Sequence, residues 1–353
     1  MSRNNRRLVF IDVARGLAII FVILGHININ SKLHCFIYSF HMPCFFILSG
    51  ITTDFLDRNK IKKYNYSLLI SYLFWSILFL FYDFFIRIFV LKRSMHLMAI
   101  RLIDFISFDG ISVLWFLPTL LICNLIVFFF VRCFNKKFII VGVLLFFHVL
   151  SVWLSKNYSV ILLKDTYISI YLVKVYTIIV RSFSICIFVY IGYICKEKIL
   201  FISEMDKKRI KLYIISFLLF ILVYLLSQIN NKVDIHSIVF GKNETFFLFN
   251  AVIGTFSVLL LSTCLEKNIL GKIFAYLGSN SLFIMATHLY LPVISVVNFF
   301  VSKLDVRYNY LEILIKIIFI LSIEFFLIEV FGKKLKIYNK RLTSFFQNKQ
   351  IFY

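Results

Sequence analysis

The chain has 353 residues, of which 61% are hydrophobic, 19% are aromatic and only 16% carry a charge. Soluble domains are about 45–50% apolar and about 25% charged, so this composition excludes an ordinary soluble protein, and its aromatic content excludes a disordered one. Lys and Arg outnumber Asp and Glu by 39 to 17, a net charge of +22. Basic loops in a membrane protein set its topology and contact anionic lipid, so we expect the lipid bilayer as a partner and no nucleic acid.

Apolar stretches of about 20 residues predict transmembrane helices. The sequence contains ten, at roughly 8–28, 34–54, 67–91, 111–131, 138–154, 167–195, 212–229, 246–264, 281–301 and 309–331. The sixth carries Lys174 and Arg181, so its first part is expected to lie along the membrane interface or to add a crossing. The predicted fold is therefore an all-α, polytopic transmembrane helix bundle, forming a single integral-membrane domain over residues 1–353.

The distribution of basic residues predicts the orientation of this bundle. Cytoplasmic loops of membrane proteins are enriched in Lys and Arg. With ten spans and a cytoplasmic N-terminus, the inner segments hold most of the basic residues, including those at the two ends of the chain: Arg3, Arg6, Arg7, Lys333, Lys334, Lys336, Lys340, Arg341 and Lys349. Both termini are therefore predicted to be cytoplasmic. The sequence gives no prediction of oligomeric state.

The seven cysteines include no CxxC pair, and several lie within apolar runs. Cys in such a setting behaves as a small hydrophobic residue. The sequence therefore predicts neither a disulfide framework nor a metal site.

The first apolar stretch carries Asp12, Arg15 and His26. A charge at the centre of a bilayer costs about 2.5–3.5 kcal/mol, so such residues are functional candidates. Asp12 and Arg15 are neighbours on one helix face. His26 lies about 16 Å farther along the helix and about 20° from the line through Arg15. This polar stripe is expected to face the bundle interior, either as an ion pair with a separately bonded histidine or as a reaction site in which His26 is the general base.

Later stretches contain further polar candidates. His41 precedes Pro43, which loosens helix hydrogen bonding, and is expected either to bond a neighbouring helix or to line the site. Trp115 is interpreted as an interfacial belt residue or a substrate contact, and His288 as a buried histidine or a site residue. A basic cluster follows the second stretch and predicts either cytoplasmic anchoring or binding of a cofactor's phosphates: Arg58, Lys60, Lys62 and Lys63.

Two motifs resemble those that open the acyltransferase-3 family of integral-membrane O-acyltransferases. They are Asp12-x-x-Arg15-Gly16 followed by His26, and His41-Met42-Pro43-x-Phe45-Phe46-x-Leu48-Ser49-Gly50. Later landmarks of the family are similar to Leu114-Trp115-Phe116-Leu117-Pro118, Tyr190-Ile-Gly192-Tyr193 and His288, and the Trp115 motif favours the branch that acetylates fucose and similar sugars. The chain departs from the family where lysines replace arginines after residue 58 and where Ser71 replaces a proline.

The resemblance implies acetyl-CoA, or another acyl-CoA, as the donor and no metal. It implies a sugar hydroxyl of a surface glycan, or of its lipid-linked precursor, as the acceptor, and a multi-pass location in the bacterial cell membrane. We therefore expect His26, Arg15 and Asp12 to be catalytic. Donor binding is expected at Arg58, Lys60, Lys62 and Lys63, and acceptor binding at His41, Trp115 and His288.

A polytopic exporter of a glycan or an acyl intermediate is the alternative function. It would also need polar helices and basic inner loops. Such transporters are often built from inverted repeats with paired broken helices. The two halves of this sequence show no such similarity, which favours the enzyme.

Overall fold

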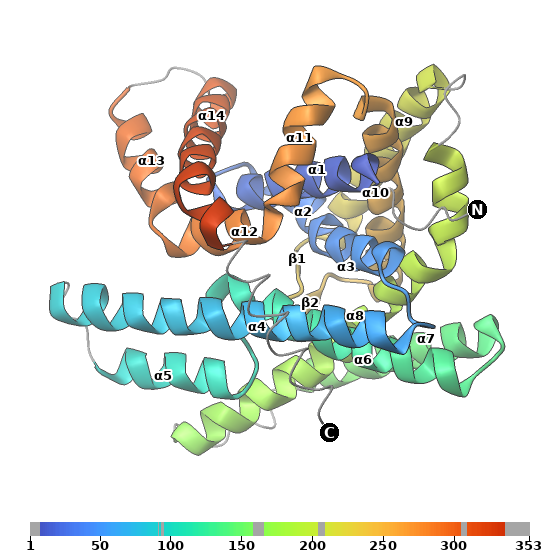
Figure 1. The fold of residues 1–353 in the computed structure, drawn as a ribbon, viewed down its shortest axis with the longest axis horizontal. Coiled ribbons are helices and arrows are strands. Elements are labelled where there is room, and N and C mark those ends of the chain that lie inside the picture. Colours follow the sequence, from blue (N-terminus) through green and yellow to red (C-terminus); the bar gives the residue numbers. More distant parts are fainter. Residues whose placement is uncertain are drawn as a thin grey trace. The chain divides into compact units, whose positions relative to one another are not determined.

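The computed structural model describes residues 8–90, 92, 95–157, 166–203, 209–304 and 309–335. The terminal basic residues that carry much of the orientation prediction, Arg3, Arg6, Arg7, Lys336, Lys340, Arg341 and Lys349, lie outside the described residues. The predicted all-α class is confirmed, since helices make up the described chain apart from one two-stranded sheet of very short strands (Figure 1).

The elements have the following bounds in chain order. They are α1 (Val9–His26), α2 (Ser31–Tyr38), α3 (His41–Thr52), α4 (Arg58–Tyr82), the π-helix η1 (Asp83–Val90), α5 (Met95–Ile106), the 3-10 helix η2 (Ser112–Trp115), α6 (Phe116–Cys133), α7 (Lys137–Lys156), α8 (Tyr167–Ser203), α9 (Arg209–Asn230), β1 (Val233–Asp234), β2 (Val239–Phe240), α10 (Glu244–Leu265), α11 (Ile269–Ser279), α12 (Ser281–Tyr290), α13 (Val293–Ser302), α14 (Asn309–Leu327) and the π-helix η5 (Ile328–Gly332).

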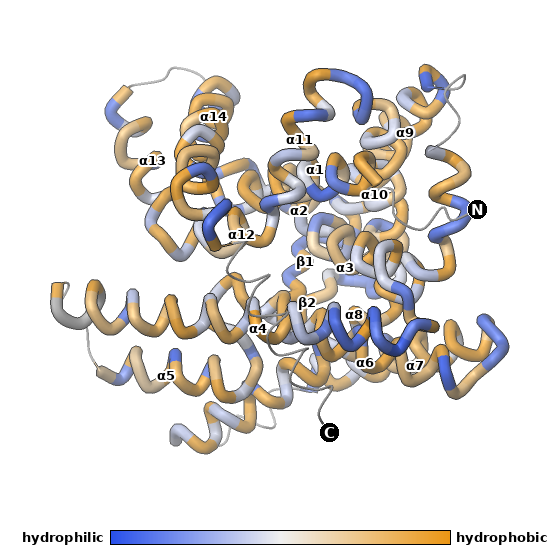
Figure 2. The backbone as a smooth tube through the Cα atoms, in the orientation of Figure 1, coloured by the Kyte–Doolittle hydropathy of each residue, from blue (hydrophilic) through white to orange (hydrophobic). Residues whose placement is uncertain are grey.

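Within the described residues, eight helices are long and apolar enough to cross a membrane, or nine if one bent pair forms a span. The first eight predicted stretches coincide with those eight, and Figure 2 shows their mostly hydrophobic course. The ninth predicted stretch is not one helix, because it contains α12 and the short α13. The bent pair that could form a span is instead α11 with α12, which meet at an angle of 71°. The tenth corresponds to α14, which carries Glu312, Lys316 and Glu324 and is too charged to be counted among the eight.

Polar side chains fix several helix starts. Asn30 accepts a hydrogen bond from the backbone N–H of Leu33 at the start of α2. Asp57 accepts from the N–H groups of Lys60 and Asn59 at the start of α4, and these bonds hold the pKa of its carboxyl below the ordinary value. Pro43 lies in the first turn of α3, where a missing N–H is tolerated, so it helps to separate α3 from α2 within one span.

The chain divides into two compact units. Unit 1 comprises Met1–Thr52, Ile191–Asp234 and Phe240–Glu329, and unit 2 comprises Thr53–Tyr190, Ile235–Val239 and Val330–Tyr353. Within unit 1, α1 packs against α11, α10, α3 and α12, and most of its side chains are buried. Helix α1 is thus the central helix of its unit, which is unusual for a segment with three ionisable groups.

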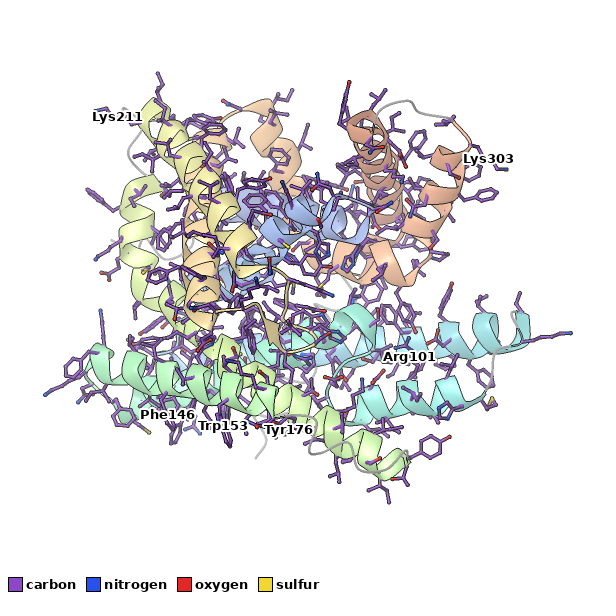
Figure 3. The ribbon with its side chains drawn as sticks, turned by 180° about the vertical axis from the view of Figure 1, so that it is seen from behind. Arg101, Phe146, Trp153, Tyr176, Lys211 and Lys303 are labelled. Carbon is purple, nitrogen blue, oxygen red and sulfur yellow. The ribbon has the colours of Figure 1, made fainter. Side chains whose placement is uncertain are left out.

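Exposed apolar side chains cover the outer faces of several helices. On α7, Phe146 and Trp153 are both 61% exposed (Figure 3). Helix α9 exposes an apolar surface that includes Phe217 and Leu218. Faces of this kind are stable against lipid and not against water, which agrees with a polytopic membrane protein.

Glycines bring the backbones of α1 and α11 into direct contact. A Cβ atom on Gly278 would overlap the carbonyl oxygen of Asp12, and one on Gly16 would overlap the carbonyl oxygen of Phe274. Small residues permit this close approach between membrane helices. Gly192 of the Tyr190–Tyr193 motif meets the carbonyl of Ile47 in the same way, which explains the small residue there.

We expect Gly278→Ala to lower the free energy of unfolding by about 1–3 kcal/mol, because the added methyl group must displace backbone. Gly142→Ala is the matched control, since a Cβ there meets nothing within 4 Å. Alanine also favours the helix at that position. Unfolding of the purified variants in detergent measures both effects, and equal stability of the two variants would contradict the packing of α1 on α11.

Candidate functional site

The first part of α1 holds an ion pair. Arg15 Nη1 lies 3.6 Å from Asp12 Oδ1, and Arg15 Nη2 donates a hydrogen bond of 3.3 Å to Thr52 Oγ1 at the end of α3. Asp12 is buried, whereas the Arg15 side chain is 29% exposed. The predicted neighbouring of Asp12 and Arg15 on one helix face is therefore confirmed. The carboxylate orients a guanidinium that still has accessible surface.

The other end of α1 holds His26, which is half-buried. Its ring centroid lies 5.3 Å from that of His288, near the end of α12. His288 is completely buried, and its Nδ1 lies 2.8 Å from the carbonyl oxygen of Ile284. The ring contact between His26 and His288 therefore joins α1 to α12, and with them two of the histidines predicted to be functional.

His41 belongs to the same region of unit 1. Its Nδ1 lies 2.8 Å from the carbonyl oxygen of Ile37, four residues earlier in the same span, so this bond is local and is not a bond to another span. His41 also interacts electrostatically with His26. Tyr38 stands beside it, with ring centroids 4.8 Å apart, and its hydroxyl donates to the carbonyl of Gly25, the residue before His26.

Sequence reasoning missed three members of this group. The ring of His34 stacks on that of Tyr38 with centroids 3.9 Å apart, and Asp234 of β1 interacts electrostatically with His26. Only the short spacing of His34, Tyr38 and His41 along the chain hinted at the first two. We call His26, His34, Tyr38, His41, Asp234 and His288 the histidine cluster.

The histidine cluster and the Asp12–Arg15 pair lie toward opposite ends of α1. Eleven residues separate Arg15 from His26, which corresponds to about 16 Å along a helix. The predicted residues of unit 1 therefore form two groups. One contains the imidazoles of His26, His41 and His288, and the other contains the Arg15 guanidinium, which Asp12 orients. The first offers ring nitrogens that can accept or donate a hydrogen bond, and the second can bind or stabilise negative charge.

The predicted phosphate-binding segment opens α4 in unit 2. All of its basic residues, Arg58, Lys60, Lys62 and Lys63, are exposed. Lys60 Nζ lies 3.2 Å from Asp54 Oδ2 and 3.3 Å from Asp57 Oδ2. These carboxylates neutralise much of its charge, so Arg58, Lys62 and Lys63 remain the stronger candidates for an anionic ligand.

Trp115 lies in η2 of unit 2 and is only 8% exposed, which does not fit an interfacial belt residue. The guanidinium carbon of Arg181 lies 5.0 Å from the centre of its ring, a cation–π contact. The ring of His236 lies 5.8 Å away. Both contacts orient the indole within its unit.

Arg181 is fully buried, and protein groups surround its guanidinium. Nη2 donates to Asp109 Oδ1 at 2.9 Å and to the Asp109 carbonyl at 3.1 Å, Nε donates to Thr119 Oγ1, and Nη1 donates to the carbonyl of His236. Lys174 Nζ contacts Asp109 Oδ2 at 3.1 Å and Asp104 Oδ1 at 2.8 Å. Arg101 on α5 (Figure 3) joins Asp104 to Asp83.

These observations correct part of the expectation for the sixth stretch. Helix α8 runs unbroken from Tyr167 to Ser203, so its first part does not add a separate crossing, and Lys174 and Arg181 are both paired with carboxylates inside unit 2. Sequence reasoning missed this network. The signal was a pair of acidic residues before the fourth stretch, Asp104 in α5 and Asp109 just after that helix, because buried carboxylates require cationic partners.

Comparison with known protein families adds one finding. A family model described as an acyltransferase domain, acyltransferase 3, matches residues 8–329. No curated protein and no solved structure matches the chain. The matched region contains α1 through α14, and therefore both groups of α1, the start of α4 and Trp115.

Proposed function

Since the chain belongs to the acyltransferase 3 family and is a multi-pass membrane acyltransferase, we propose that it transfers an acetyl group from acetyl-CoA to a sugar hydroxyl. The acceptor is a surface glycan or its lipid-linked precursor, of the kind handled by the fucose O-acetylase-like branch, and the location is the bacterial cell membrane. The single observation that carries the proposal is the contact of His26 with His288 at the end of a buried helix.

In this proposal the His26 imidazole is the general base. It removes the proton from the acceptor hydroxyl as the oxygen attacks the thioester carbonyl. The tetrahedral intermediate then collapses, the C–S bond breaks, and the thiolate of CoA takes the proton from the His26 imidazolium. The products are the sugar ester and free CoA, and no other reactant is consumed.

Arg15 supplies positive charge in the same proposal. Its guanidinium is oriented by Asp12 and by Thr52 and keeps accessible surface. Because it lies about 16 Å along the helix from His26, we assign it to the pantetheine–phosphate arm of the donor and not to the reacting carbonyl. A planar guanidinium suits that task because it binds phosphate in a bidentate manner.

The remaining predicted residues bind the two substrates. Arg58, Lys62 and Lys63, with a lesser contribution from Lys60, are proposed to attract the phosphates of CoA. His41 and His288 are proposed to line the acceptor site. Trp115 is proposed to stack on a sugar ring, since Arg181 and His236 fix the orientation of the indole.

The test is acyl transfer by the purified protein in detergent micelles, with acetyl-labelled acetyl-CoA and a panel of fucosides and other glycosides. We expect label in an ester of at least one glycoside, with little transfer to the matching deoxy sugar that lacks the acceptor hydroxyl. An exporter would leave the label in acetyl-CoA with every acceptor, and that result would reject the proposal.

A further inference from the structure

The imidazole of His288 has one nitrogen without a hydrogen-bond partner in the described part of the chain. The residue is completely buried in unit 1. Its Nδ1 lies 2.8 Å from the carbonyl oxygen of Ile284, whereas Nε2 has no hydrogen-bond partner among the described residues. A buried polar atom without a partner is costly and calls for a functional explanation.

The bond to Ile284 determines which nitrogen carries the proton. A carbonyl oxygen can only accept, so Nδ1 of His288 must donate. The neutral imidazole then has its lone pair on Nε2, which is an acceptor. His41 is anchored in the same way, with Nδ1 on the carbonyl of Ile37. In each case the helix backbone fixes the tautomer of a buried histidine.

The aromatic neighbour of His288 is His26, with ring centroids 5.3 Å apart and ring planes inclined by 45°. At that separation, facing ring nitrogens can approach to the hydrogen-bonding range of about 2.7–3.2 Å. A neutral His26 has one N–H to donate and one lone pair. His288 Nε2 is thus a buried acceptor beside the base that the proposed function requires.

We propose that His288 is the positioning residue of His26. When the substrates bind, the two rings close the remaining gap, so that Nε2 of His288 accepts the N–H of His26 and the lone pair of His26 points toward the acceptor hydroxyl. This inference rests on the proposed function, because it concerns the same base. It gives His288 a role beyond lining the acceptor site.

The role has a defined place in the reaction. While His26 takes the hydroxyl proton and later returns one to the departing thiolate, the hydrogen bond to His288 stays in place. That bond strengthens when His26 becomes an imidazolium, because bonds from ionised donors are stronger. His288 itself gains and loses no proton. An orienting group behind a catalytic imidazole plays the same part in the Ser-His-Asp arrangement.

The test compares two amide substitutions at one position. In His288→Gln the amide reaches the position of Nε2 and keeps an acceptor there. In His288→Asn the shorter amide reaches only the position of Nδ1. We expect His288→Gln to retain kcat within a fewfold of wild type. We expect His288→Asn to lose roughly 10- to 100-fold in kcat with the KM for acetyl-CoA nearly unchanged, less than the ~10⁴ lost with a charged orienting group.

Controls separate this inference from the function on which it rests. His148→Asn changes another fully buried histidine, in α7 of unit 2, and is expected to leave kcat unchanged. Equal kcat values for His288→Gln and His288→Asn would overturn the inference, whether both were active or both inactive. If His26→Ala kept full activity in the same assay, the proposed base itself would be rejected, which is a different result.

Discussion

Asp109→Asn is expected to lower the free energy of unfolding by about 3–5 kcal/mol, the cost of removing one partner from a buried ion pair. The substitution keeps the shape of the side chain and removes its charge. Arg181, which is fully buried, then loses the Asp109 carboxylate and keeps neutral acceptors in the Thr119 hydroxyl, the His236 carbonyl and the carbonyl of residue 109. Lys174 still retains Asp104.

Asp104→Asn is the matched control for this prediction. Its ion-pair partners, Arg101 and Lys174, are 29% and 27% exposed, and each keeps another carboxylate, Asp83 or Asp109. Water and the remaining partner therefore compensate much of the loss. Unfolding of both variants in detergent measures the difference. A loss at Asp104 equal to that at Asp109 would contradict the central place of the Arg181–Asp109 pair in unit 2.

His26→Ala is expected to lower kcat by about 10²–10⁴-fold, the usual contribution of a general base. The KM for acyl-CoA should change little, because the proposed donor contacts lie at Arg15 and at the start of α4. Removal of a half-buried imidazole from the end of α1 should leave the close packing of α1 on α11 intact, since that packing depends on Gly16 and Gly278. Initial rates at saturating substrates, with protein amounts matched by folded yield, measure the effect.

A His26→Ala variant with a raised KM for acyl-CoA and an unchanged kcat would contradict the role of His26 as the base. That pattern is typical of a residue that binds ground state and transition state equally. His148→Ala serves as the control for loss of a buried imidazole elsewhere in the chain.

The sequence predicts the fold class well because lipid imposes a simple rule. Every backbone group must be bonded internally, so long apolar stretches become helices. The first eight predicted stretches agree with the eight helical spans for this reason. The rule fails where a helix bends, as between α11 and α12, because hydropathy does not report an angle of 71° between two apolar helices.

The candidate site was only partly predictable. Asp12 and Arg15 lie three residues apart, so helix geometry alone makes them neighbours, and they form an ion pair. The contact of His26 with His288 joins α1 to α12, and no local pattern reveals such a pairing. The burial of Arg181 was missed for the same reason, since its partners Asp109 and Thr119 lie on other segments of the chain.

The measurement that tests the central claim most directly is a stoichiometry, made on liposomes that contain this chain as their sole protein. Acetyl-CoA and an acceptor glycoside are supplied, and free CoA thiol and sugar ester are quantified together. One thiol should appear for each ester formed, and both should fall together in His26→Ala. Thiol release without ester, or passage of glycoside across the bilayer with neither product, would contradict the account.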